Sequence, residues 1–378
     1  MDKKNILLLF GGESPEHEVS IISAKQIFKK INKDKYNIFP IYLDKDHQFK
    51  YIPEFETFKE FKDFIKLKKY NIEIRLKKGE VNIYLNKFVK LKKVDASLLT
   101  FHGGEGESGD IQGFLNTLKI PYTGPNIKGA IYGIDKIVMK YILEKNNIEI
   151  LPWMYITKNE WLENKKDVIK KIKKFHEYPL IVKPSSMGSS IGVKKVSNDE
   201  DLEEIIDSDI LYDNNIIIEK FKDKVVEITY SLIKEKNNIL ISLSEEIEKD
   251  LDKIYSYENK YLQGGKKNKA EGMSAERKNI PANISKKLDD RIKEASFKIY
   301  EVLNSQSLVR IDYLVDVKND TFYTIEINTI PGSLSYYLWE AKGIPFEEMI
   351  DKMIDSAIYD FKEQEKILKN IDSPLWNQ

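Results

Sequence analysis

The sequence contains no cysteine, and this absence removes several kinds of chemistry at once. Disulfide bonds, zinc sites built on thiolates and cysteine nucleophiles are all excluded. Long hydrophobic runs are also absent: residues 6–10 are too few for the core of a signal peptide, and no later run approaches the ~18 residues of a membrane span. We therefore expect a cytoplasmic protein without a membrane partner.

The chain has no net charge, because 61 Lys and Arg residues balance 61 Asp and Glu residues. The two signs are interspersed, so no overall field favours nucleic acid as a partner. A length of 378 residues predicts about two or three domains, and 41% hydrophobic with 32% charged residues is typical of a globular protein. We interpret the Lys-rich residues 50–95 as a solvated elaboration of the first domain.

Arginine is scarce, with only four among the 61 basic residues, and one of the four lies inside an apolar stretch near the C-terminus. Alternation in residues 309–328 predicts a hairpin with Arg310 and Asp312 on one face of its first strand and Glu326 and Asn328 on one face of its second. Three oxygen ligands of this kind suit Mg²⁺ held against substrate phosphates. A hairpin whose polar face simply meets water is the alternative, which this stretch alone leaves open.

The chain begins with a predicted buried strand at residues 6–10, a Gly11-Gly12 turn and an amphipathic helix over residues 19–31. Such a turn places backbone N–H groups and a helix N-terminus at the carboxyl end of a strand, where open α/β sheets bind ligands. Glu16 lies in the first helical turn, where it could also do no more than complement the helix dipole.

A second strand followed by a glycine-rich loop is predicted at residues 96–109, with a helix beginning at Asp110. Four glycines in residues 102–109 allow a close approach of backbone to a ligand, and a surface turn is the alternative. The Asp135-Lys136 pair follows on a predicted helix, where a lysine is by default solvated.

Residues 180–193 predict a strand, a loop of Ser and Gly residues and a returning strand. The stretch lacks the Gly-Lys-Ser/Thr sequence of a P-loop, but its N–H groups and hydroxyls could cover phosphates as a lid. An inward-pointing Lys183 would need an anionic partner. A plain surface hairpin is the alternative. The next predicted strand, residues 216–221, ends with Glu219 and Phe221.

In combination, these motifs resemble the D-alanine:D-alanine ligase family of the ATP-grasp superfamily. The resemblance runs through nearly the whole chain in the family's order. The matching motifs are residues 11–20, residues 102–113 with Ser108 in place of the usual Asp, Asp135-Lys136, the loop of residues 183–192, Lys260-Tyr261, Arg310-x-Asp312, and Glu326-x-Asn328-Thr329-x-Pro331-Gly332.

The resemblance implies an α/β protein with a three-part ATP-grasp architecture, which begins with a doubly wound parallel-sheet domain. We expect an N-terminal substrate-binding domain in residues 1–124, a central ATP-grasp subdomain in residues 125–218 and a C-terminal catalytic domain in residues 219–378.

The resemblance also implies roles for individual residues. Asp312, Glu326 and Asn328 would hold two Mg²⁺ ions, for which Mn²⁺ could substitute. Glu16 would receive the ammonium group of the first D-amino acid, and Arg310 and the Gly332 amide would stabilise the oxyanion. The residues expected at ATP are Lys136, Lys183 and Lys260 at the phosphates, Ser189 and Ser190 over them, and Glu219, Lys220, Phe221 and Glu227 around the adenosine; Ser189 and Tyr261 would also orient Glu16.

The implied activity is ATP-dependent ligation of two D-alanines to D-alanyl-D-alanine through an acyl phosphate, for peptidoglycan synthesis, by a homodimer. The alternatives are a ligase of the same fold that takes D-serine or D-lactate second, and a catalytically weak nucleotide-binding relative. Tyr261 argues against D-lactate, and the complete set of metal ligands argues against the weak relative.

One departure concerns the second substrate. The family usually has a serine where this chain has Tyr337, and that serine meets the carboxylate of the incoming D-alanine. We expect either weak binding of the second D-alanine or replacement of the serine by another group such as Ser335.

Overall fold

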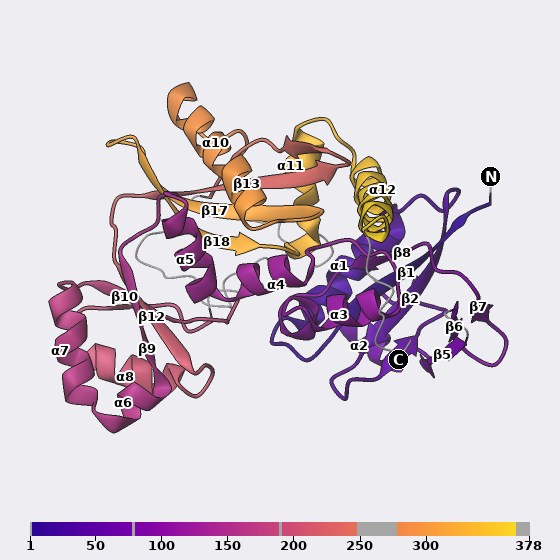
Figure 1. Ribbon diagram of the computed structural model, residues 1–378, viewed down its shortest axis with the longest axis horizontal. Coiled ribbons are helices and arrows are strands. Elements are labelled where there is room, and N and C mark those ends of the chain that lie inside the picture. Colours follow the sequence, from indigo (N-terminus) through magenta and orange to yellow (C-terminus); the bar gives the residue numbers. More distant parts are fainter. Residues whose placement is uncertain (1, 78–79, 189–190, 248–277, 368–378) are drawn as a thin grey trace, which may run out of the picture.

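The computed structural model of the chain describes residues 2–77, 80–188, 191–247 and 278–367. Three larger sheets occupy successive stretches of the chain, and a small three-stranded sheet accompanies the first of them (Figure 1). The α/β class predicted from the sequence is therefore confirmed. Within the described residues, no helix combines the length and the apolar character that crossing a membrane requires.

The first sheet is parallel at its centre, where β1 lies between β2 and β8. Both glycine-rich loops follow parallel strands, β1 and β8, so they meet at the same edge of the sheet. Two short antiparallel strands extend the sheet on the β2 side. The elements of this part are β1 (Lys4–Gly11), α1 (His17–Lys30), β2 (Tyr36–Leu43), β3 (Phe49–Tyr51), α2 (Phe61–Lys66), β4 (Tyr70–Asn71), β5 (Glu73–Lys77), β6 (Glu80–Tyr84), β7 (Lys90–Leu91), β8 (Ala96–Leu99), η1 (Gly104–Gly106) and α3 (Asp110–Thr117).

The second sheet has helices packed against one face. Ile216 and Ile218 of β12 belong to a buried cluster with side chains of three helices, among them Trp161. Lys183 and Glu219 alternate with these apolar residues and so project from the opposite face. The elements are α4 (Ile127–Ile134), α5 (Lys136–Lys145), β9 (Trp153–Thr157), α6 (Lys158–Glu163), α7 (Lys165–Phe175), β10 (Leu180–Pro184), β11 (Lys194–Val196), α8 (Asp199–Asp209) and β12 (Asn215–Lys220).

The third sheet separates apolar from polar side chains with a period of two. Ile228, Tyr230, Ile311 and Tyr313 are buried in a cluster that includes residues of α10. We call the opposite surface, which carries Thr229, Ser231, Arg310, Asp312, Glu326 and Asn328, the polar face. The elements are β13 (Val226–Glu235), β14 (Asn238–Ile241), β15 (Glu245–Ile247), β16 (Lys278–Asn279), α10 (Lys286–Val302), β17 (Leu308–Asp316) and β18 (Thr321–Asn328).

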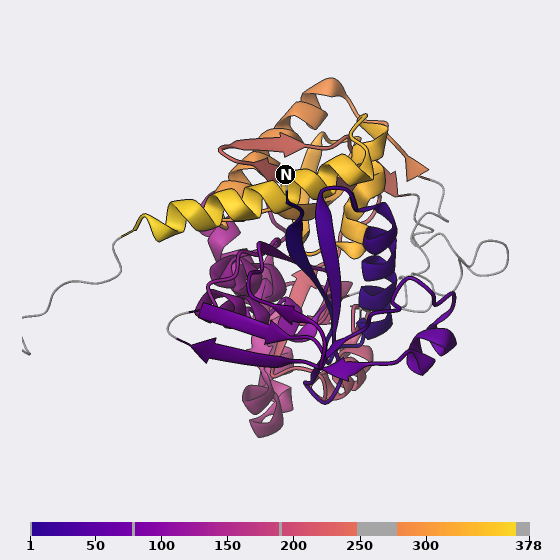
Figure 2. The same cartoon turned by 90° about the vertical axis from the view of Figure 1, so that its right-hand side faces the viewer.

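The C-terminal helix returns to the first sheet. Met353 and Ile354 of α12 share a buried cluster with β1 and β8, and Lys4 pairs with Asp355 at 2.9 Å. Figures 1 and 2 both show α12 beside these strands. The turn after β18 therefore runs between the first and third sheets. The remaining elements are η2 (Gly332–Ser335), α11 (Tyr336–Ala341) and α12 (Phe346–Glu365).

Candidate active site

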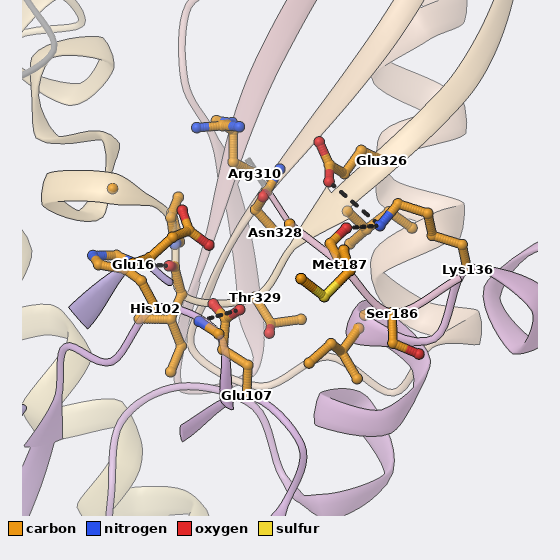
Figure 3. Close-up of a pocket in the computed structure, with 18 residues that line it drawn as sticks. Glu16, His102, Glu107, Lys136, Ser186, Met187, Arg310, Glu326, Asn328 and Thr329 are labelled. Carbon is orange, nitrogen blue, oxygen red and sulfur yellow. Dashed lines mark hydrogen bonds and ion pairs between the residues drawn. The ribbon is translucent and has the colours of Figure 1, made fainter. Parts of the chain in front are cut away.

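A pocket lies where the two glycine-rich loops, the start of α5 and the β17–β18 hairpin meet (Figure 3). It encloses about 680 Å³ of atom-free space, part of which is open to solvent. Segments far apart in the sequence contribute to its wall, and six of the residues that were given a role in the sequence analysis line it. These are Glu16, Lys136, Arg310, Glu326, Asn328 and Gly332.

The hairpin predicted from alternation is confirmed, with Arg310 opposite Asn328 and Asp312 opposite Glu326. Asp312 is 3% exposed, and Arg310 donates to both of its carboxylate oxygens, at 2.9 and 2.8 Å. Asn328 donates to Asp312 at 3.1 Å, and Thr229 donates to it at 2.9 Å. Burial acts to lower the pKa of Arg310, but the Asp312 charge outweighs it and the pKa lies well above its ordinary value.

A metal ion at this hairpin would have two carboxylates and one amide oxygen from the protein. The described part of the chain holds no group of three or more His, Asp or Glu side chains placed to bind a metal. Asp312, Glu326 and Asn328 are nevertheless the hard oxygen donors that Mg²⁺ prefers, and Mg²⁺ commonly completes its coordination with water and phosphate oxygens. The residues present fit such an ion.

Lys136 lies at the phosphate end of the predicted site. Asp135 caps α5 by accepting from the N–H groups of Ile137 and Val138, and Ser185 donates to the same carboxylate at 3.1 Å. The Lys136 ammonium donates to the Met187 carbonyl at 2.7 Å and lies 3.8 Å from Glu326. Burial lowers the pKa of Lys136 despite the opposing Glu326 charge. The Asp135-Lys136 pair thus joins α5 to the loop after β10.

Lys183 does have the anionic partner that its burial requires, and this partner is Glu219 at 2.7 Å. Lys140 forms an ion pair with the same carboxylate from the other side. Burial acts to raise the pKa of Glu219, but the two ammonium charges outweigh it and bring the pKa to about 2. Sequence reasoning missed Lys140, although it follows Lys136 by one helical turn and so shares a face of α5 with it.

Glu16 lies close to the loop that follows β10. A β-carbon added at Gly188 would come within 2.9 Å of Glu16 Oε2. A β-carbon at Gly103, whose φ is +68°, would come within 2.9 Å of the Ser14 hydroxyl and 3.8 Å of the same Glu16 oxygen. Two of the glycines selected from the sequence therefore allow backbone to approach this carboxylate closely.

His102 fixes the loop that carries Gly332. Its Nδ1 lies 3.0 Å from the Ile330 carbonyl, and its Nε2 lies 2.9 Å from the Ser23 hydroxyl. Burial lowers the pKa of His102, so the ring is neutral; Nδ1–H then donates to Ile330, and Nε2 accepts from Ser23. Ser23 in turn accepts from the Ser333 N–H at 3.2 Å. The histidine stood in a selected motif, but nothing in the sequence indicated this positioning role.

Glu107 is a pocket residue for which sequence reasoning gave no role. Its Oε2 atom accepts from the Gly103 N–H at 3.0 Å (Figure 3). Burial, assisted by the nearby Glu16 charge, raises the pKa of Glu107 to about 8. The pocket therefore contains a carboxyl group that retains its proton near neutral pH.

The residues expected around the adenosine do not line this pocket. Glu219 is engaged by the two lysines, and Lys220 is exposed at the end of β12. The Lys195 ammonium lies 4.1 Å from the centre of the Phe221 ring, and Glu227 is half-buried on β13. Four further candidates, Ser189, Ser190, Lys260 and Tyr261, lie outside the described residues.

The two departures from the family pattern have local partners. The Ser108 hydroxyl donates to Asp110 in the first turn of α3. The Tyr337 hydroxyl donates to Glu245 Oε2 at 2.6 Å, and Tyr337 is not among the residues that line the pocket. Ser335, the suggested replacement, is completely buried, and its hydroxyl has no hydrogen-bond partner within the described chain. Like Tyr337, it is not among the residues that line the pocket.

Comparisons with known proteins agree with one another. Residues 5–125 match the family model for the D-ala D-ala ligase N-terminus, and residues 142–355 match that for the C-terminus. The D-alanine–D-alanine ligase of Thermosipho africanus is 40% identical over 376 residues, which cover 99% of this chain and 98% of the relative. That of Thermosipho melanesiensis is 37% identical, with 98% of each chain covered.

Solved structures give the same result for the fold. The D-alanine–D-alanine ligase of Coxiella burnetii superposes with a TM-score of 0.80 at 23% identity, covering 97% of each chain. The enzyme of Helicobacter pylori superposes with a TM-score of 0.72 at 26% identity, covering 94% of this chain and 98% of that one. The Bacillus anthracis enzyme complexed with ATP gives a TM-score of 0.68 at 26% identity, covering 96% and 100%.

Proposed function

Because the chain belongs to the D-alanine–D-alanine ligase family, we propose that it joins two D-alanine molecules at the expense of ATP, for peptidoglycan synthesis. The observation that carries the proposal is the composition of the pocket. Glu16, which would take an ammonium group, lines one side, and Lys136 with Glu326, which would act on phosphates, lines the other (Figure 3). Arg310 and Gly332 also line the pocket.

The chemistry needs two steps, because a carboxylate is a poor acyl donor. A carboxylate oxygen of the first D-alanine attacks the γ-phosphorus of ATP, and ADP leaves. The amine of the second D-alanine then attacks the carbonyl carbon of the acyl phosphate. Inorganic phosphate leaves with the original carboxylate oxygen, the amine loses a proton, and the peptide bond remains.

The side of the pocket that contains Lys136 would supply positive charge and hold the phosphates in place. Lys136 and Lys183 would contact the phosphates of ATP, where positive charge stabilises phosphoryl transfer. Asp312, Glu326 and Asn328 would hold two Mg²⁺ ions, which when bound would neutralise charge on the phosphate oxygens. Lys260, Ser189 and Ser190 would complete this end.

The side of the pocket that contains Glu16 would orient the first D-alanine. Glu16 would receive its ammonium group, with Ser189 and Tyr261 as an orienting set. Arg310 and the Gly332 amide would stabilise the oxyanion that forms at the carbonyl. His102 supports this proposal because its hydrogen bond to Ile330 holds the backbone two residues before Gly332.

The finer assignments are also proposals. The residues proposed to surround the adenosine are Glu219, Lys220, Phe221 and Glu227. The division into residues 1–124, 125–218 and 219–378, the homodimer and the cytoplasmic location also remain proposals.

A coupled assay of ADP release, with products identified by mass spectrometry, tests the function. D-alanine, D-serine and D-lactate would each be offered as second substrate, and L-alanine would serve as the stereochemical control. We expect ADP release that requires D-alanine, with D-alanyl-D-alanine as the main product. ADP release without any dipeptide or depsipeptide, or equal activity with L-alanine, would contradict the proposal.

A further inference from the structure

The pocket contains one carboxyl group that the two-step chemistry leaves without a task. Glu107 lines the pocket together with Glu16. Figure 3 shows the side chains of Glu16 and Glu107 on the same side of the pocket, with Lys136 and Glu326 across from them. A group that can gain or lose a proton beside the proposed ammonium site changes how strongly that site attracts a cation. The protonation of Glu107 therefore bears on substrate binding.

Gly103 connects the two carboxyl groups. Its N–H donates to Glu107 Oε2 at 3.0 Å, and a β-carbon added to it would lie 3.8 Å from Glu16 Oε2. The φ of Gly103 is +68°, a conformation that favours glycine, so this close approach to both side chains depends on the absence of a side chain at position 103. Because Oε2 of Glu107 accepts the N–H, a proton on this carboxyl group is held by the other oxygen, Oε1.

The surroundings of Glu107 explain why it keeps a proton. Burial is the largest influence, and the charges of Glu16 and Glu326 act in the same direction, so the pKa of Glu107 rises to about 8. The Gly103 N–H and the Lys136 ammonium act in the opposite direction without outweighing these influences. A positive charge that arrives beside Glu16 would change this balance in favour of the charged form of Glu107.

On the premise of the proposed function, we propose that Glu107 loses its proton when the ammonium group of the first D-alanine binds at Glu16. Before binding, the pocket holds a neutral carboxyl group and a carboxylate on the same side. After binding, it holds two carboxylates and one ammonium group, and the proton of Glu107 has passed to water or buffer. The proton and the substrate's ammonium group therefore compete, and D-alanine binding is coupled to proton release.

The expected size of the effect follows from the charge that arrives. An opposite charge at ~4–6 Å favours the ionised form of a carboxyl group by roughly ten- to a thousandfold. With its pKa at about 8, Glu107 is protonated in roughly nine of ten free molecules at pH 7. Binding at pH 7 should then release roughly 0.4–0.9 proton per first D-alanine. Because a higher pH removes the competing proton, D-alanine should bind roughly 5- to 50-fold more tightly at pH 8 than at pH 6.

Glu107→Gln removes the exchangeable proton and keeps an oxygen that can accept from the Gly103 N–H. Glu105→Gln is the matched control on the same loop. Glu105 accepts from the Glu13 N–H at 3.0 Å, and it is not among the residues that line the pocket. Thermal unfolding followed by circular dichroism establishes that both variants are folded before their binding is compared with that of the wild type.

The measurement is isothermal titration calorimetry of D-alanine into each protein in the presence of ADP and Mg²⁺, so that no turnover occurs. Titrations at pH 7 in PIPES and in HEPES, whose ionisation enthalpies differ, give the number of protons released from the difference in observed heat. We expect roughly 0.4–0.9 proton for the wild type and Glu105→Gln, and none for Glu107→Gln. Titrations at pH 6 and pH 8 should show the gain in affinity in the first two proteins, and a much smaller gain in Glu107→Gln.

The wild-type titrations alone can overturn the proposal, whether or not the variants fold. Equal heats in the two buffers would show that no proton leaves when D-alanine binds. Proton release that persists in Glu107→Gln would assign the proton to another group and would also overturn the proposal. Absence of any binding heat with the wild type in either buffer is a different outcome, because it contradicts the proposed function itself.

Discussion

The two faces of the third sheet differ in what they contribute, although alternate residues of the same strands form both. On one face, Ile311 and Tyr313 are completely buried in an apolar cluster with α10. On the other, Arg310 and Asp312 form a buried ion pair that is hydrogen-bonded across three strands. We therefore expect the first face to contribute mainly to fold stability and the second to the proposed chemistry, although the residues of the two faces are neighbours along the chain.

Helix α5 repeats this division. Met139 and Leu143 are buried with the apolar face of the sheet, whereas Lys136 and Lys140 project to the pocket and to Glu219. Lysine is ordinarily a solvent-exposed residue, and its burial is costly unless an anion lies close. The predictions below test whether the two faces can be changed independently.

The largest effect is expected from Ile311→Ala on the apolar face. Deletion of a completely buried aliphatic side chain should lower the free energy of unfolding by about 2–5 kcal/mol, because both burial and packing are lost. Urea unfolding followed by circular dichroism measures this. A decrease below about 1 kcal/mol would show that this face does not carry the stability assigned to it.

Glu326→Gln is the corresponding change on the polar face. The substitution removes one negative charge from the proposed metal site. Turnover should fall by ~10²-fold or more, which is the scale of losing one electrostatic contact in a transition state. The unfolding curve should match the wild type. Steady-state ADP release at saturating Mg²⁺ is the readout, and near-normal turnover in the folded variant would remove Glu326 from the metal site.

Lys140→Met tests the polar side of α5. The substitution leaves Glu219 buried with Lys183 as its remaining ion-pair partner. We expect a loss of about 1–3 kcal/mol in unfolding free energy, less than for Ile311→Ala, because half of the compensating charge persists. Chemical denaturation of both variants in one buffer compares them. If Lys140→Met is as stable as the wild type or more stable, packing at this site matters more than charge.

The last prediction concerns the pH dependence of stability. The pKa of Glu107 in the folded protein is about 8, whereas an unfolded glutamate titrates near its ordinary value of about 4.3. Between about pH 5 and pH 8 the unfolded chain has therefore lost a proton that the folded protein keeps, so stability falls as the pH rises.

Glu107→Gln should flatten that part of the profile, with a gain over wild type that grows towards pH 8. Melting temperatures across this range give the comparison. Ile311→Val on the apolar face serves as control and should keep the wild-type slope. A constant offset between Glu107→Gln and wild type would contradict the raised pKa.

The sequence predicted much of the fold because its strands have clear periods. Alternation located the β17–β18 hairpin and the faces of Arg310 and Asp312, and uninterrupted apolar runs located β1 and β8. The two glycine-rich loops were also found from a local pattern, because their glycines follow directly after these apolar runs. Alternation cannot identify the neighbour of a strand, so the position of Thr229 opposite Asp312 became visible only with the register of β13 and β17.

Buried polar contacts between distant segments were the other features missed. Lys140 looks like any solvated helical lysine until Glu219 is placed beside it. His102 carried a motif, but its bonds to Ser23 and Ile330 join residues that are 79 and 228 positions away. Tyr337 was recognised as a departure from the family, yet its partner Glu245 lies 92 positions away. Local patterns contain no information about such pairs.

The most direct test of the proposed chemistry follows an oxygen atom. D-alanine labelled with oxygen-18 in its carboxylate would be incubated with the enzyme and ATP, and the released phosphate analysed by mass spectrometry. The account predicts ADP as the nucleotide product, and phosphate that carries one labelled oxygen from the first D-alanine. Unlabelled phosphate, or release of AMP and pyrophosphate with the label in AMP, would contradict the acyl phosphate and with it the assignment of the polar face to phosphoryl transfer.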